Sequence, residues 1–117
     1  MGKLEPFTHT IALLGANGSI TLPGTGDYYS AMGGNRIVGS VFTDQAGTLL
    51  FHWSSDMANN DIPDDSIAIV ANTKTAINVE VKAPFCQVVY TNGAGGAQTV
   101  FRLFLYIVDS TSNKTVT

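Results

Sequence analysis

The residues whose types and spacing could do chemistry are few, and the densest group of them is acidic. Four aspartates and two asparagines lie close together: Asp56, Asn59, Asn60, Asp61, Asp64 and Asp65. Their oxygens could bind calcium, although the spacing lacks the central glycine and closing glutamate of an EF-hand loop. The same residue types favour turns, because their side chains bond to nearby backbone N–H groups. We expect a solvated or self-capped turn, with calcium as the alternative, and assign no metal ligands.

No nucleophile with a base beside it can be assembled from the other candidates. Cys86, the only cysteine, lies in the strand-like run PFCQVVY, where a buried and inert thiol is expected. His9 and His52 could activate it, but nothing in their spacing places either one beside the thiol. His52 lies between Phe51 and Trp53, which indicates a partly buried or interfacial histidine. We therefore expect a protein that is not an enzyme and that uses no cofactor.

Tyr28 and Tyr29 are the better candidates for contact with a ligand. They lie in the glycine-rich run PGTGDYYSAMGG, which lacks the lysine and the strand–helix context of a phosphate-binding loop. An aromatic ring face is a platform on which a sugar can stack. Trp53 could serve in the same way, but its place on a strand fits a core position better. The two tyrosines are therefore the predicted ligand contacts.

Composition limits the class of protein to which the chain can belong. It has 117 residues, enough for one domain, of which 13% are charged, against roughly 25% in a typical domain. The net charge is −3 and the 6 basic residues are scattered, so we expect no nucleic-acid partner. No apolar run approaches the roughly 20 residues of a membrane span. The first residues also lack the apolar core of a signal peptide, so we expect no membrane partner and synthesis in a cytoplasm.

Turn signals divide the chain into short strands. The runs that read as strands are Thr8–Leu14, Ser19–Leu22, Arg36–Thr43, Thr48–Ser54, Ser66–Val70, Thr75–Lys82, Phe85–Thr91 and Thr99–Val108, with a short piece at Tyr28 and Tyr29. Residues 55–65 read as an irregular loop, and Gly47 is expected to take positive φ at the end of a tight turn. Strands that recur about every 8–12 residues, without a helical period, predict an all-β fold. We expect an antiparallel β-sandwich, jelly-roll-like, with about eight strands.

The last predicted strand is apolar on both faces. Alternate positions place Phe101, Leu103, Leu105 and Ile107 on one face. The other face carries Arg102, Phe104, Tyr106 and Val108, which is too apolar for open solvent. Either a segment of the same chain, such as residues 28–32, or a neighbouring subunit is expected to cover this second face. We assign Phe104, Tyr106 and Val108 to a subunit or capsid contact.

Several runs taken together resemble a β-sandwich domain of structural proteins of tailed bacteriophages. The similarity is carried by GSVFTDQAGTLLFHWSSD, INVEVKAPF, VVYTNG and TVFRLFLY, in that order between positions 39 and 106. Domains of this kind resemble capsid decoration proteins, head fibres and tail-associated proteins. Two departures are Asp56-Met57-Ala58, where the pattern usually has Asp-Gly, and the bulky run Phe51-His52-Trp53.

The resemblance implies a symmetric assembly, often a homotrimer, on a virion surface. The expected function is that of a capsid decoration protein, which binds the outer capsid as an oligomer and stabilises the head. Its partners would be further copies of itself and the phage major capsid protein or another virion protein. It would be made in the host bacterial cytoplasm. The alternative is a host-recognition or glycan-binding module of a fibre or baseplate, with contacts through Tyr28 and Tyr29.

The first ten residues have few features of their own. We expect residues 1–10 to form an N-terminal arm, or else a frayed terminus, and residues 11–117 to form a single β-sandwich domain. An arm would anchor to a capsid or to a neighbouring subunit through Phe7 and His9.

Overall fold

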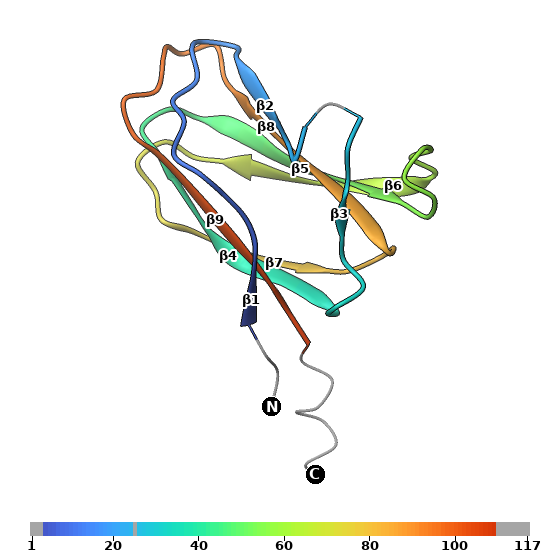
Figure 1. Cartoon of the computed structure of the whole chain (residues 1–117). Coiled ribbons are helices and arrows are strands. Elements are labelled where there is room, and N and C mark those ends of the chain that lie inside the picture. Colours follow the sequence, from blue (N-terminus) through green and yellow to red (C-terminus); the bar gives the residue numbers. More distant parts are fainter. Residues whose placement is uncertain (1–3, 25, 110–117) are drawn as a thin grey trace.

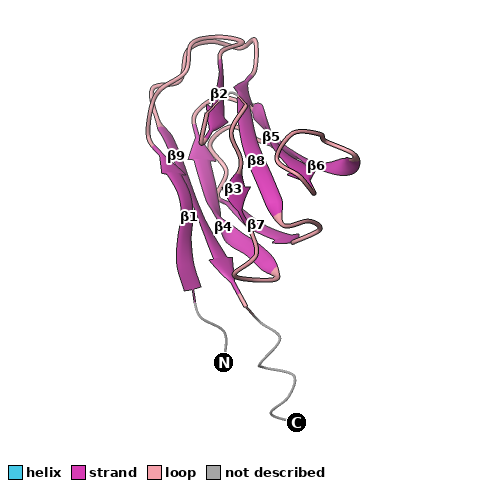
Figure 2. Cartoon of the chain, turned by 45° about the vertical axis from the view of Figure 1, so that its right-hand side comes forward, coloured by secondary structure: helices cyan, strands magenta, loops and turns pink. Residues whose placement is uncertain are grey.

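The computed structural model describes residues 4–24 and 26–109, which fold into a sandwich of two antiparallel sheets (Figure 1). Its strands are β1 (Leu4–Thr10), β2 (Ser19–Leu22), β3 (Tyr29–Ser30), β4 (Arg36–Thr43), β5 (Gly47–Ser54), β6 (Ile62–Ile69), β7 (Thr75–Glu80), β8 (Phe85–Asn92) and β9 (Phe101–Val108). Sheet A has the order β1-β9-β4-β7 and sheet B the order β2-β8-β5-β6, with β3 also paired to β8. Figure 2 shows strands joined by loops alone, which confirms the prediction of an antiparallel β-sandwich.

The connectivity is that of a jelly roll. When the two-residue strand β3 is set aside, eight strands remain, and the chain passes back and forth between the two sheets. The first, eighth, third and sixth of these strands form sheet A, and the second, seventh, fourth and fifth form sheet B. This is the double-sheet arrangement of jelly-roll domains, and it agrees with the expected fold.

The core lies between the sheets and follows the period of two in the sequence. Along β9 the buried apolar residues are Phe101, Leu103, Leu105 and Ile107, and along β5 they are Leu49, Phe51 and Trp53. Full burial of one large apolar side chain contributes about 1.5–3 kcal/mol, so these two strands supply much of the driving force for folding. Cys86 is also buried, as predicted. Among the described residues, no helix is long and apolar enough to cross a membrane.

The first strand begins and ends earlier than the sequence indicated. Strand β1 pairs with β9 from Leu4 opposite Val108 to Thr10 opposite Leu103. Ile11 and Leu13, which suggested a strand up to position 14, lie in the following loop and are 67% and 56% exposed. Residues 4–10 of the expected arm therefore belong to the sandwich, while residues 1–3 lie outside the described part of the chain.

Strand β6 also begins earlier than predicted. Residues 62–65 were expected to lie in the acidic loop, but they pair with β5, with Ile62 opposite Trp53 and Asp65 opposite Phe51. Strand β6 is at the edge of sheet B and pairs with β5 alone. A proline such as Pro63 is tolerated at an edge, where its missing N–H breaks no inner ladder. The pairing with β5 thus overrides the turn-forming composition of this segment.

Gly47 does not take the positive φ that was predicted for it. It is the first residue of β5, and a Cβ atom at this position would lie 2.5 Å from the hydroxyl oxygen of Tyr90. The glycine is therefore required for space, because it lets the Tyr90 ring pack across β5. In the core this ring lies 4.7 Å from the ring of Phe101, between centroids.

We expect the substitution Tyr90→Phe to stabilise the protein. The Tyr90 side chain is fully buried and its hydroxyl has no hydrogen-bond partner. An unsatisfied buried polar group costs about 1–3 kcal/mol, so the free energy of unfolding in urea at pH 7 should rise by about 1 kcal/mol. A variant that is less stable than the wild type at pH 7 would contradict this expectation.

The same substitution should change how stability depends on alkaline pH. Burial raises the pKa of Tyr90 from 10.0 to about 12. The unfolded chain therefore loses this proton at a lower pH than the folded chain, and the wild type loses stability as the pH rises from 10 towards 12. In Tyr90→Phe this loss of stability should be smaller. The other three tyrosines are present in both proteins, so they do not affect the comparison. Urea unfolding at pH 7 and at pH 10.5 measures the difference.

Candidate interaction surface

The outer face of sheet A carries a stripe of apolar side chains. The stripe consists of Val38, Ser40 and Phe42 on β4, Phe104, Tyr106 and Val108 on β9, and His9 on β1. The register places Val38 opposite Tyr106 and Ser40 opposite Phe104. Neighbours on one face of a sheet contact each other, and here Val38, Phe104 and Tyr106 remain only half-buried.

His9 joins this stripe from the neighbouring strand. Its ring centroid lies 5.3 Å from that of Phe104 and 5.4 Å from that of Tyr106. A register shift in β1 between Pro6 and Thr8 sets the alternation of this strand. Three of the residues predicted to form a subunit or capsid contact, His9, Phe104 and Tyr106, are thus brought together, and Val108 follows on the same face of β9.

Phe7 does not join the stripe. It is 9% exposed and lies on the inner side of the sandwich, where its ring centroid is 4.8 Å from that of Tyr29. The Tyr29 hydroxyl donates a hydrogen bond of 2.6 Å to Oγ1 of Thr8. These contacts fasten β3 to β1 along the edge of the sandwich. Tyr29 is therefore engaged within the fold, and both Tyr28 and Tyr29 are half-buried.

The face of β9 that carries Phe104 is not where residues 28–32 pack. Strand β3 pairs with β8 in the other sheet, with Tyr29 opposite Cys86. The segment that was expected as an alternative cover for Phe104 and Tyr106 therefore closes the edge of the sandwich instead. Among the described residues, His9 provides the aromatic contacts to this face.

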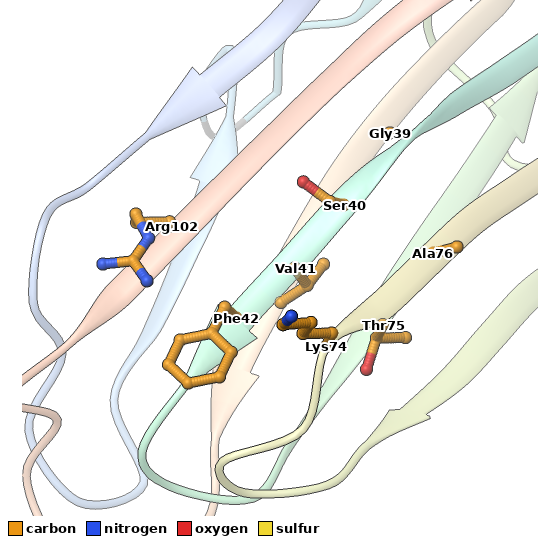
Figure 3. A pocket seen from close by; sticks show the side chains of 8 residues that line it. All are labelled: Gly39, Ser40, Val41, Phe42, Lys74, Thr75, Ala76 and Arg102. Carbon is orange, nitrogen blue, oxygen red and sulfur yellow. The ribbon is translucent and has the colours of Figure 1, made fainter.

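A depression of about 540 Å³ over β4 and β7 overlaps the stripe at Ser40 and Phe42 (Figure 3). It lies where small residues, among them Gly39, Ser40 and Ala76, leave room on the sheet. Phe42, Lys74 and Arg102 also line it. The guanidinium carbon of Arg102 is 5.1 Å from the centroid of the Phe42 ring, a cation–π distance. This groove combines apolar side chains with two cations.

Sequence reasoning missed this groove, although one signal was present. Ile37 and Val41 face the core, so the alternation in RIVGSVFT places Val38 and Phe42 on the opposite face. The positions of Lys74 and Arg102 could not be found in this way. They meet beside Phe42 only because β4 pairs with both β7 and β9.

The acidic loop folds back on itself. Asp56 Oδ1 accepts hydrogen bonds from the backbone N–H groups of Asn59 and Ala58, and Oδ2 accepts one from the Asn59 amide. The Asn59 N–H is the largest cause that lowers the pKa of Asp56 well below its usual range. Both carboxylate oxygens are engaged, which is the arrangement of a self-capped turn. Within residues 4–24 and 26–109, no three His, Cys, Asp or Glu side chains form a group that could hold a metal ion.

Two of the other three aspartates of the acidic group, Asp64 and Asp65, have a structural partner. Asp64 Oδ1 lies 3.0 Å from Nδ1 of His52, which is partly buried as predicted. Asp65 Oδ2 accepts a hydrogen bond of 2.8 Å from Nε1 of Trp53 and lies 2.8 Å from Nζ of Lys82. The acidic loop therefore closes the hairpin that β5 and β6 form.

The single thiol lies on the far side of its sheet from His52. Cys86 pairs with Trp53 and faces the core, while His52 pairs with Gln87 and faces outward. Burial raises the pKa of the Cys86 thiol, which disfavours the reactive thiolate. The structure therefore does not bring these two residues together.

Fold and surface define a jelly-roll domain with an apolar, aromatic outer sheet face. Residues 3–108 match the family described as the uncharacterised protein YqxG N-terminal domain. Since the match spans the whole sandwich, the chain belongs to this family. Comparison with curated proteins and with solved structures gave no match.

Proposed function

We propose that this chain is a structural domain of a bacteriophage virion, of the capsid decoration type, that binds its neighbours through the outer face of sheet A. The observation that carries the proposal is the cluster of His9, Phe104 and Tyr106 on that face. Apolar surface removed from water contributes roughly 25 cal/mol per Å². Burial of these rings in a contact is therefore favourable through the hydrophobic effect alone.

The virion setting is supported by the sequence resemblance, and the jelly roll is compatible with it. Capsid proteins and lectins both use this fold, so the fold alone assigns no function. A decoration protein acts through contacts that must break before the shell opens. It stabilises the assembled shell by binding that state in preference to the open one.

The test uses virions of the phage that carries the gene, produced without this protein. We expect such particles to release DNA at a lower temperature than complete particles. Added wild-type protein should restore the release temperature, and Phe104→Asn should fail to do so. Leu50→Asn is the matched control, because Leu50 is half-buried on the outer face of sheet B.

Both variants are first compared by urea unfolding, to show that each is folded when added. Absence of the protein from purified particles would refute the proposal. If Phe104→Asn and Leu50→Asn restored the release temperature equally, the outer face of sheet A would not be the contact surface.

A further inference from the structure

We infer that the free edge of strand β7 pairs with the same edge of a second copy, so that the two copies of sheet A join into one antiparallel sheet. The pairing places Ile77 opposite Ile77 of the second copy, and Lys74 opposite Glu80 of the second copy. This association uses the edge of the sheet and not the stripe on its outer face. It therefore goes beyond the proposed function and does not depend on it.

Strand β7 has a row of backbone groups that point away from the sheet. It lies at the end of sheet A, where it pairs with β4 alone. Just beyond this pair, in the same register, the N–H of Val81 donates a hydrogen bond of 2.9 Å to the carbonyl oxygen of Asn35. Along an antiparallel ladder, residues bonded to the neighbouring strand alternate with residues whose backbone groups point the other way. The odd-numbered residues of β7 thus bond to β4, and the outward ones are Ala76, Asn78 and Glu80.

Two further contacts agree with this direction. The Glu80 carbonyl oxygen accepts a hydrogen bond of 3.4 Å from Nζ of Lys82, a donor outside the ladder. The N–H of Asp44 donates to the carbonyl oxygen of Val100 at 3.4 Å, so the even-numbered residues of β4 bond to β9 and the odd-numbered ones to β7. Ala76 and Asn78 are exposed, and within the described residues no group bonds to their outward N–H and C=O. The edge can therefore accept another strand.

The other sheet edges carry features that hinder such pairing. Strand β1 contains Pro6 and a register shift between Pro6 and Thr8. Strand β6 contains Pro63 and pairs irregularly with β5. The remaining edge is divided between the short strands β2 and β3, which both pair with β8. Proteins use prolines, bulges and short strands to keep edges from joining. Of the described edge strands, β7 alone is regular and longer than four residues, which indicates an edge available for pairing.

Symmetry and charge select the register. In an isologous contact, a two-fold axis perpendicular to the sheet pairs residues that lie on the same face. Two such registers overlap β7 with itself equally well, one centred on Ile77 and the other on Asn78. The first places Lys74 opposite Glu80 of the second copy, whereas the second places Lys74 opposite Lys82. Opposite charges in directly facing positions stabilise a sheet and like charges destabilise it, so the register centred on Ile77 is favoured.

The neighbouring charges allow this pair to form. Arg36 lies opposite Glu80 on β4, but its Nε donates to Oδ1 of Asn78 at 2.6 Å. Within the described chain, Glu80 and Lys74 form no ion pair. In the dimer the Glu80 carboxylate lies between Arg36 of its own copy and Lys74 of the second, so the signs alternate across the joined sheet. The Asp44 carboxylate is held by N–H groups of β9 and its adjoining loop, on the side of β4 away from β7.

The other facing pairs are also compatible with a second copy as the partner. Ala76 lies opposite Asn78 of the second copy, and the two exchange backbone hydrogen bonds because both have outward N–H and C=O groups. On the inner face Thr75 lies opposite Val79, and Ile77 opposite itself. Facing β-branched residues are favourable in a sheet. No like charges meet, so the edge is self-complementary, as a two-fold contact requires.

The test is sedimentation velocity of the full chain from micromolar to about millimolar concentration. A six-residue edge makes a small contact, so we expect a wild-type dimer that dissociates at the low end of this range. Ala76→Pro should weaken dimerisation at least tenfold, because it removes an outward N–H that β4 does not use. Ala76→Ser keeps this N–H and should dimerise like the wild type. Urea unfolding shows whether Ala76→Pro is folded.

A charge exchange tests the register separately. Lys74→Glu or Glu80→Lys alone should weaken dimerisation about fivefold, because each replaces two opposite-charge contacts across the axis with like-charge ones. The double variant should recover most of the wild-type affinity. Asp61→Lys, an equal change of net charge on an exposed loop residue, should have little effect beyond that of net charge. If Ala76→Pro does not fold, this exchange decides the question.

Three results would overturn the inference. They are a monomer at the highest concentration, a folded Ala76→Pro that dimerises as tightly as the wild type, and a double charge variant as weak as the single ones. Phe104→Asn should leave the dimer unchanged, because Phe104 lies on the outer face of β9 and not at the edge. A dimer that Phe104→Asn abolishes would place the contact on the stripe and also overturn the inference. Restoration of virions through Phe104 is judged independently of all these results.

Discussion

Replacing Gly39 with alanine should prevent β4 and β9 from pairing. A Cβ atom at Gly39 would overlap the carbonyl oxygen of Phe104 and lie 3.0 Å from Cα of Leu105. Both are backbone atoms, so no rotation of a side chain can relieve the overlap. The two central strands of sheet A would have to separate, and we expect a loss of at least about 3 kcal/mol in the free energy of unfolding.

The matched control is Gly33→Ala. A Cβ atom at Gly33 would have no atom within 4 Å, and this residue is not among those with positive φ. We expect its free energy of unfolding in urea to stay within about 0.5 kcal/mol of the wild type. A Gly39→Ala protein that unfolds at the same urea concentration as Gly33→Ala would show that the strands can accommodate the methyl group.

The second large effect is expected for Asn92→Asp. Asn92 is fully buried, and its Nδ2 donates hydrogen bonds to the carbonyl oxygens of Gly15 at 2.9 Å, Gly96 at 2.8 Å and Leu14 at 3.4 Å. One amide thus joins the β1–β2 loop to the β8–β9 loop. Aspartate has nearly the same shape, but it would place a charged oxygen against three carbonyl oxygens. An uncompensated buried charge costs about 3–5 kcal/mol, and we expect a loss of this size at pH 7.

The pH dependence of this variant provides an internal check. The buried carboxyl should have a folded-state pKa above its unfolded value of about 3.9. Its protonated form can donate a hydrogen bond, so the deficit in stability should shrink as the pH falls from 7 towards 4. Asn72→Asp, at an exposed turn residue, should change stability little at either pH. A deficit for Asn92→Asp that does not depend on pH would exclude the charge as its cause.

Asn92 lies at the end of the sandwich where the β1–β2 loop and the β8–β9 loop meet. Gln98 supports the same contact, because its backbone N–H donates to the carbonyl oxygen of Leu14 and its side chain accepts from the N–H of Leu14. The two loops are therefore held by amide side chains.

The alternation of apolar residues was readable from the sequence by itself. It determined which faces of β5, β7 and β9 enter the core, because successive side chains of a strand point to opposite sides. It also placed Phe104, Tyr106 and Val108 on one outer face. The class of fold followed from the spacing of the strands and their turn signals.

Only the tertiary structure decided the features that depend on contacts between distant segments. Pairing with β9 set the limits of β1, turned Phe7 inward and brought His9 onto Phe104. Pairing with β5 extended β6 into the acidic segment. Gly39 and Gly47 are required by the close approach of Phe104 and Tyr90, each more than 40 positions away. A local pattern records the face of a strand, but not which strand lies beside it, because that choice depends on the packing of the whole chain.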